Sequence, residues 1–195
     1  MKDPADAVLA LGKVVDAMEG LGIPYFVTGS LASTAYGLPR TTVDADLVAE
    51  VRPAHVRPLS EALSPAFYVS EDAVRAAVAR GASFNLIHLD TMVKVDVFVL
   101  RERPYDREAF ARRRRETMGE GEALREFFLS APEDVVLSKL DWFRRGGETS
   151  ERQWNDVLGV LRVSGGSLDA AYTERWAREL GISDLLARAR AEASA

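Results

Sequence analysis

The sequence predicts an α+β protein in which a small mixed sheet, flanked by helices, precedes a C-terminal helical segment. Short apolar stretches alternate with helical patterns up to about residue 100, whereas from Pro132 onward only helical spacing recurs. The composition, 47% hydrophobic and 28% charged in 195 residues, is that of an ordinary globular chain. We therefore expect a core domain over residues 1–125 and a helical subdomain over residues 126–195.

The elements of the first half follow from the spacing of their apolar residues and from glycine and proline stops. Residues 4–20 repeat apolar side chains at helical spacing and end at Gly20. Asp90-Thr91 joins the last two predicted strands as a hairpin. The predicted helices are 4–20, 31–36, 53–63 and 71–80, and the predicted strands are 25–28, 43–51, 67–69, 83–89 and 92–100.

The second half is predicted to be helical, after an arginine-rich segment over residues 101–130 that no pattern assigns. Trp142, Phe143 and Trp154 fall at helical spacing and are expected in the core rather than on a base-stacking surface. The predicted helices are 133–144, 150–162, 168–179 and 183–192.

Composition argues against several classes of protein. The absence of cysteine rules out disulfides, thiolate metal sites and cysteine nucleophiles, and two isolated histidines do not make a zinc site. A net charge of −5 argues against nonspecific coating of nucleic acid. No segment has the apolar core of a signal peptide or the ~20 apolar residues of a membrane span, so we expect a cytoplasmic protein without membrane contact.

Asp44 and Asp46 are the first candidate functional residues. Side chains two apart share one face of a strand, so the two carboxylates stand together while Ala45 and Leu47 face the core. Adjacent carboxylates repel one another unless a cation lies between them, and a divalent cation with a preference for oxygen ligands is the natural partner.

Asp96 repeats this pattern in a strand whose opposite face consists of four valines. An acid in so apolar a strand needs a partner, and a neighbouring strand with Asp44 and Asp46 would bring three carboxylates together. Three carboxylates can hold two ions ~3.5–4 Å apart, which activates an attacking oxygen and stabilises a leaving pyrophosphate. Lys94, on the face of Asp96, would offset negative charge or contact phosphate.

Gly29-Ser30 lies where a predicted strand ends and a short helix begins. Glycine permits close approach, and the first N–H groups of the helix, with the positive end of its dipole, suit phosphate oxygens. Ser30, the expected helix cap, adds a hydroxyl donor.

Gly29-Ser30, a short helix, Arg40-Thr41-Thr42, Asp44-Ala45-Asp46 and a later strand aspartate together resemble the nucleotidyltransferase superfamily of polymerase-β-like fold. Within it, the chain most resembles bacterial AbiEii-type nucleotidyltransferases, which include toxins of toxin–antitoxin pairs. The segments around Lys139 and Asp156 are similar to that family's downstream lysine helix and Arg…Asp helix.

The resemblance implies metal-dependent transfer of a nucleoside monophosphate from a nucleoside triphosphate, such as ATP, to a hydroxyl. It implies that Asp44, Asp46 and Asp96 hold Mg²⁺ or Mn²⁺, and Asp96 is the candidate for deprotonating the acceptor. The implied partners are RNA, such as tRNA, and a cognate antitoxin. The predicted nucleotide-binding residues are Gly29, Ser30, Arg40, Thr42, Lys94, Lys139 and Asp156.

Some of these residues also have structural interpretations. Lys139 is one of only four lysines among 25 basic residues, yet a helical lysine ordinarily faces solvent. Asp156 would be exposed or paired with Arg152 one turn back. Arg40 would meet phosphate or simply neutralise the acids. The run Arg112–Arg115 is either a solvated face or a docking surface for RNA phosphates.

Two other functions stay open at this point. One is a catalytically silent nucleotide-binding module that acts through a protein partner, and the other is a nucleotidyltransferase of small molecules such as antibiotics. The complete set of three acids argues against the silent module, because an inactive protein has no need of mutually repelling carboxylates. The sequence does not identify the acceptor.

Overall fold

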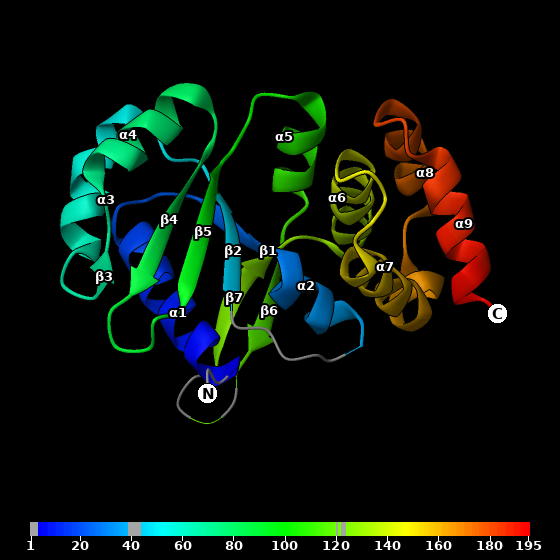
Figure 1. Cartoon of the computed structure of the whole chain (residues 1–195), viewed down its shortest axis with the longest axis horizontal. Coiled ribbons are helices and arrows are strands. Elements are labelled where there is room, and N and C mark those ends of the chain that lie inside the picture. The colour runs from blue at the N-terminus through cyan, green and yellow to red at the C-terminus, as the bar shows by residue number, and fades with distance from the viewer. Residues whose placement is uncertain (1–3, 39–43, 120, 122–123) are drawn as a thin grey trace. The chain divides into compact units, whose positions relative to one another are not determined.

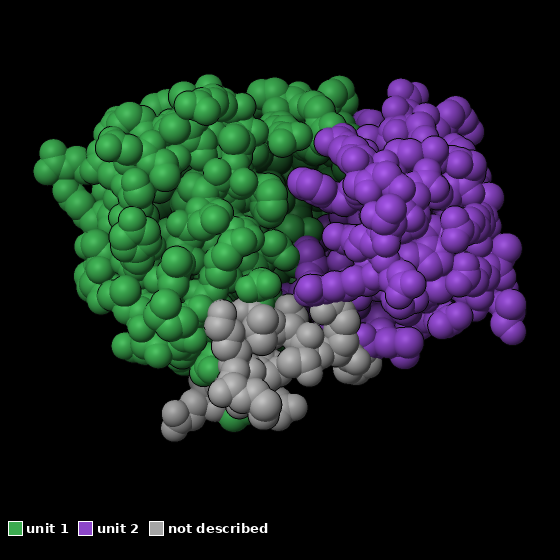
Figure 2. Space-filling view, in the orientation of Figure 1, with its two compact units in different colours: residues 1–28, 41–129 green, residues 29–40, 130–195 purple. Residues whose placement is uncertain are grey.

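The computed structural model describes residues 4–38, 44–119, 121 and 124–195. The chain forms two compact units, coloured separately in Figure 2. The first consists of residues 1–28 and 41–129, and the second of residues 29–40 and 130–195. The predicted α+β class is confirmed. Among the described residues, no helix combines the length and the apolar character needed to cross a membrane.

The first unit contains a mixed sheet with strand order β3-β4-β5-β2-β1-β7-β6 (Figure 1). The pairs β2–β5 and β1–β7 are parallel, and the other neighbouring strands are antiparallel. The strands are β1 (Tyr25–Thr28), β2 (Asp44–Ala49), β3 (Phe67–Tyr68), β4 (Ser83–His88), β5 (Lys94–Val99), β6 (Arg114–Met118) and β7 (Arg125–Leu129).

Alternation along the central strands separates an apolar face from a polar one. Leu47 of β2 and Val95 and Val97 of β5 are fully buried, as predicted from their spacing. Helix α1 packs against β2, β5 and α3, and its Leu11 is also fully buried. The helices of this unit are α1 (Pro4–Gly20), η1 (Pro53–His55), α3 (Val56–Leu63), α4 (Glu71–Arg80) and α5 (Pro104–Ala111).

The second unit is helical, and α2 packs against α6 and α7 within it. A Cβ on Gly37, just after α2, would lie 2.8 Å from the Val160 nitrogen of α7, so the two backbones meet without an intervening side chain. The helices are α2 (Gly29–Tyr36), α6 (Pro132–Arg145), α7 (Glu151–Ser164), η3 (Gly165–Ser167), α8 (Ala170–Glu179) and α9 (Ser183–Ala193).

Three aromatic residues of this unit were expected in its core. Phe143 and Trp154 are buried, with ring centroids 5.2 Å apart. Trp142 is 54% exposed, so that expectation was wrong. It lies one residue before buried Phe143 on α6, and adjacent positions of a helix point in different directions.

Candidate active site

The predicted carboxylates lie on the polar face of two adjoining parallel strands. Asp46 of β2 is directly opposite Asp96 of β5, and Asp44 is opposite Lys94. All four residues are half-buried, while the residues between them are fully buried. The alternation seen in the sequence therefore places acids from two strands, fifty residues apart in the chain, in one register.

Lys94 neutralises part of this acidic face. Its Nζ lies 2.8 Å from Oδ2 of Asp96. The hydrogen bond to Asp96 raises the pKa of Lys94 above its ordinary value, and the charges of Asp96, Asp44 and Asp46 act in the same direction. The ammonium therefore stays protonated beside Asp96.

Two residues that were not predicted from the sequence, Thr28 and Asn85, extend the same polar row. Thr28 of β1 is opposite Asp46, and Asn85 of β4 is opposite Asp96. Thr28 ends its strand, and Asn85 interrupts the apolar pattern of β4, so both stood out as polar residues. Only the strand order and register, which the sequence does not provide, align them with the aspartates.

Gly29 links β1 directly to α2. Its φ is +63°, a left-handed conformation that glycine adopts without steric cost. Helix α2 starts at Gly29 rather than at the predicted residue 31, so Ser30 lies in the first turn and is not the cap. The Ser30 hydroxyl accepts a hydrogen bond from Arg152 at 3.1 Å.

Lys139 and Asp156 form a buried ion pair within the second unit. Lys139 Nζ lies 2.8 Å from Oδ2 of Asp156 and donates a second hydrogen bond to Gln153 at 3.2 Å. Their side chains are only 7% and 6% exposed. Neither residue is a solvated helical position, and Arg152, the alternative partner of Asp156, contacts Ser30.

Arg40 and Thr42 lie outside the described residues. The arginine run Arg112–Arg115 is partly engaged in packing, because the Arg113 guanidinium lies 4.5 Å from the ring centroid of Phe110 and donates to its carbonyl oxygen at 2.7 Å.

The donor chemistry of the aspartate face suits a divalent cation, since carboxylate oxygens are the ligands that Mg²⁺ and Mn²⁺ prefer. Within the described part of the chain, however, no three acidic or histidine side chains are grouped closely enough to hold an ion. Asp96 is instead paired with Lys94. A metal ion and the Lys94 ammonium would compete for the same carboxylate.

The sequence matches no protein-family model, and no curated protein matches it. Solved structures do share its fold. The solution structure of the antibiotic-resistance factor ANT(2'')-Ia aligns with 98% of this chain and 96% of its own, with a TM-score of 0.54 and 15% identity. The crystal structure of ANT(2'')-Ia with adenylyl-2''-tobramycin gives a TM-score of 0.54 at 14% identity, covering 89% of this chain and 95% of that one.

A third similar structure is an antigenic nucleotidyltransferase-like protein from Paracoccidioides brasiliensis. It covers 95% of this chain and 92% of its own, with a TM-score of 0.53 and 18% identity. The alignments extend over nearly the whole of each chain. The protein therefore has the α+β fold of nucleotidyltransferases, with its polar sheet face made by β2 and β5.

Proposed function

We propose that this protein is a metal-dependent nucleotidyltransferase. The observation that supports this most is the register of Asp46 with Asp96, with Asp44 two residues along the same strand face. These three carboxylates would hold Mg²⁺ or Mn²⁺, which supplies charge neutralisation at the α-phosphate and the leaving group. The nucleotidyltransferase fold of the chain supports the same reaction class.

In the proposed reaction, the oxygen of an acceptor hydroxyl forms a bond to the α-phosphorus of a nucleoside triphosphate. The bond from that phosphorus to the bridging oxygen breaks, and pyrophosphate leaves. Asp96 takes the hydroxyl proton, while protein groups hold the phosphates. We propose Gly29, Ser30 and Lys94 as phosphate contacts.

The other proposed nucleotide-binding residues are Arg40, Thr42, Lys139 and Asp156. Because Lys139 is buried and paired with Asp156, we assign this pair a positioning role, through α6 and α7. The Gln153 and Arg152 contacts on α7 connect that pair to Ser30 within one helical unit.

A labelling experiment tests the proposal. The protein is incubated with each α-³²P-labelled nucleoside triphosphate and Mg²⁺, in the presence of total RNA, protein lysate and hydroxyl-bearing antibiotics. We expect pyrophosphate release and a labelled acceptor, both lost in Asp46→Asn. Triphosphate binding without label transfer to any acceptor would favour the silent nucleotide-binding module instead.

The acceptor that we favour is a small molecule with hydroxyl groups. The structures that share the fold include one with adenylylated tobramycin, and the net charge of −5 does not favour RNA. RNA, such as tRNA, with a cognate antitoxin in a toxin–antitoxin pair, is the second candidate. The AbiEii-type resemblance and the exposed Arg114 and Arg115 of β6 support it.

A further inference from the structure

A cavity lined by charged and apolar residues lies in the first unit, at the opposite end of β2 and β5 from the aspartates. Its volume is about 610 Å³, within the range of small-ligand sites. Glu50 and Leu100, which directly follow the two parallel strands, contribute to its lining. Glu50 follows Asp46 by four positions, or about 13 Å of extended strand, so the cavity is distinct from the row of carboxylates.

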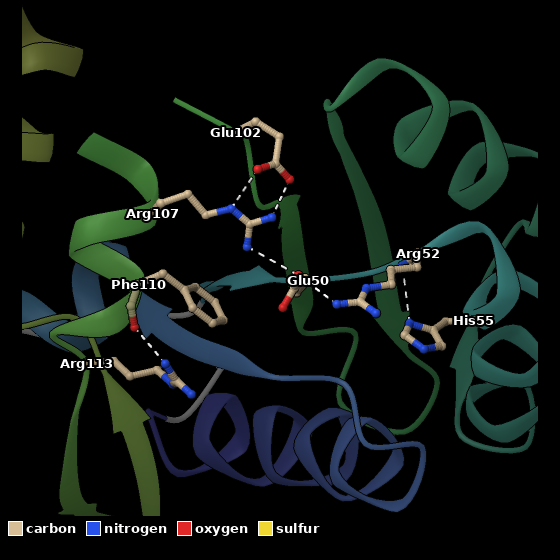
Figure 3. A network of polar contacts seen from close by, with 7 residues as sticks. All are labelled: Glu50, Arg52, His55, Glu102, Arg107, Phe110 and Arg113. Carbon is tan, nitrogen blue, oxygen red and sulfur yellow. Dashed lines mark hydrogen bonds and ion pairs between the residues drawn. The ribbon is translucent and has the colours of Figure 1, made fainter. Parts of the chain in front are cut away.

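A network of ion pairs borders this cavity (Figure 3). Arg107 of α5 donates two hydrogen bonds to the carboxylate of Glu102, one of them from Nε to Oε2 at 2.9 Å. It also donates to Glu50 at 3.2 Å, and Arg52 donates to the same Glu50 oxygen at 3.0 Å. Two arginines thus share one glutamate, and the other glutamate, Glu102, is 80% exposed.

Two further arginines line the cavity, Arg80 at the end of α4 and Arg101 after β5. Arg101 donates from Nε to the Gly81 carbonyl at 3.2 Å, which leaves both of its Nη groups available. The Arg80 side chain makes no hydrogen bond or ion pair with any residue that the structure describes. Four arginines therefore face only two glutamates in the lining, and a bound anion would relieve their mutual repulsion.

The rest of the lining is apolar. Val51 and Leu100 are buried, and Val78 of α4 contributes a further aliphatic side chain. Such a surface suits the organic body of a ligand whose charged group meets the arginines. Guanidinium groups bind phosphate through several parallel hydrogen bonds, and a phosphate offers enough oxygens for more than one arginine.

We propose that this cavity binds a small phosphate-bearing molecule, with Arg80, Arg101 and Arg107 contacting the phosphate. The ligand displaces the exposed Glu102 carboxylate from Arg107, because both are anions that need the same guanidinium. A nucleotide and a sugar phosphate share this chemistry. The two ligands differ in that only the nucleotide has a base, which could contact the apolar part of the lining.

Calorimetric titration of the full chain, with EDTA present to remove divalent cations, tests the site. The probes are adenosine 5′-monophosphate, ribose 5-phosphate and inorganic phosphate. We expect saturable binding of the two organic phosphates, weakened about tenfold by Arg80→Gln, since one charge-assisted contact is lost. Tighter binding of the monophosphate than of ribose 5-phosphate identifies a nucleotide site, and equal binding identifies a sugar-phosphate site.

Three further variants test whether the phosphate binds in this cavity. Arg178→Gln removes the same charge from an exposed position on α8 and should leave binding unchanged. Glu102→Gln should strengthen binding, which loss of structure cannot do, because the competing carboxylate is gone. Asp46→Asn should not affect it. The proposal is overturned by the absence of binding for all three probes, by equal affinity in wild type and Arg80→Gln, or by loss of binding in Asp46→Asn.

Discussion

Asp44 and Asp46 stand on the same strand face, and Asp46 is opposite Asp96. The Lys94 ammonium lies 2.8 Å from Oδ2 of Asp96. We expect Asp46→Asn to abolish Mg²⁺-dependent binding of nucleoside triphosphate. The free energy of unfolding should stay equal or rise, because the substitution relieves repulsion between carboxylates. Calorimetric titration and thermal unfolding measure the two effects.

The control for this prediction is Glu179→Gln, which removes one negative charge from an exposed position on α8. It should change neither binding nor stability. Wild-type Mg²⁺-dependent binding in Asp46→Asn would contradict a metal site on β2.

The buried pair of Lys139 and Asp156 makes a second prediction. Lys139→Met leaves the Asp156 carboxylate buried without its cation, so the free energy of unfolding should fall by about 3 kcal/mol. In Lys139→Met/Asp156→Leu both charges are gone, and part of the loss should be recovered. Urea unfolding measures both variants.

An exposed pair supplies the comparison. Arg57 and Glu61 are one turn apart on α3, with Arg57 77% exposed, and Arg57→Met should change stability by less than about 1 kcal/mol. Equal effects of Lys139→Met and Arg57→Met would show that burial of the Lys139 pair has no energetic importance.

His88 predicts a pH dependence of stability. Its ring is fully buried, with Nε2 2.8 Å from Lys13 Nζ and Nδ1 2.8 Å from Thr91 Oγ1. Burial first, and then the charge of Lys13, lower the pKa of His88, while the charges of Asp90 and Asp6 oppose this shift. The buried environment therefore favours the neutral form of the His88 ring.

The direction of this pH dependence of stability follows from proton binding by the folded and unfolded states. Above the ordinary histidine pKa of about 6.5 the ring is neutral in both the folded and unfolded states. As the pH falls below this value, the unfolded chain binds a proton first, so stability decreases until the pH passes the lowered pKa of the folded state. Urea unfolding at pH 7.5 and 5.5 should show a smaller loss in His88→Gln than in the wild type. An equal loss would contradict the assignment.

At the scale of elements, the contact between the end of α2 and α7 depends on the absence of a side chain. A Cβ on Gly37 would lie 2.8 Å from the Ser33 carbonyl oxygen and from the Val160 nitrogen, both of them backbone atoms. We expect Gly37→Ala to lower the free energy of unfolding by about 1–3 kcal/mol, as overpacking does. Gly166→Ala, where a Cβ meets nothing within 4 Å, should be close to neutral. Equal stability of the two variants would exclude this close packing.

The elements themselves were predictable to different degrees. Strict alternation of valines gave β5 and its aspartate, because one face of that strand is buried by α1. The segment 101–130 was not assignable, because arginines there take part in packing. The Arg113 guanidinium lies over the rings of Phe110 and Phe128. Because arginine is counted as a charged residue, a pattern of hydrophobic residues does not detect this packing contact. Register and partner choice, as for Lys139 with Asp156, depend on tertiary structure alone.

At the scale of the whole chain, charge bears on the acceptor. The net charge of −5 does not favour binding to RNA. With a small-molecule acceptor, turnover should depend only weakly on salt between 50 and 200 mM. Over the same range, a protein that makes many contacts with nucleic-acid phosphates loses ~10³–10⁵ in affinity. Arg114→Ser/Arg115→Ser should then retain near-normal transfer. Steep salt dependence, with reduced transfer in that variant, would identify RNA as the acceptor. Steady-state rates at several salt concentrations decide between them.

The domain division near residue 125 stays a prediction. The compact units divide the chain differently, because residues 29–40 belong with residues 130–195.

The separation of residues 29–40 from the rest of their unit in the sequence has a consequence for synthesis on the ribosome. Helix α2 emerges about 90 residues before its partner helices, which at ~5–20 residues per second is a delay of roughly 5–20 s. During that interval the apolar side of α2 has nothing to cover it, so the nascent chain passes through a stage in which this helix is a target for chaperones.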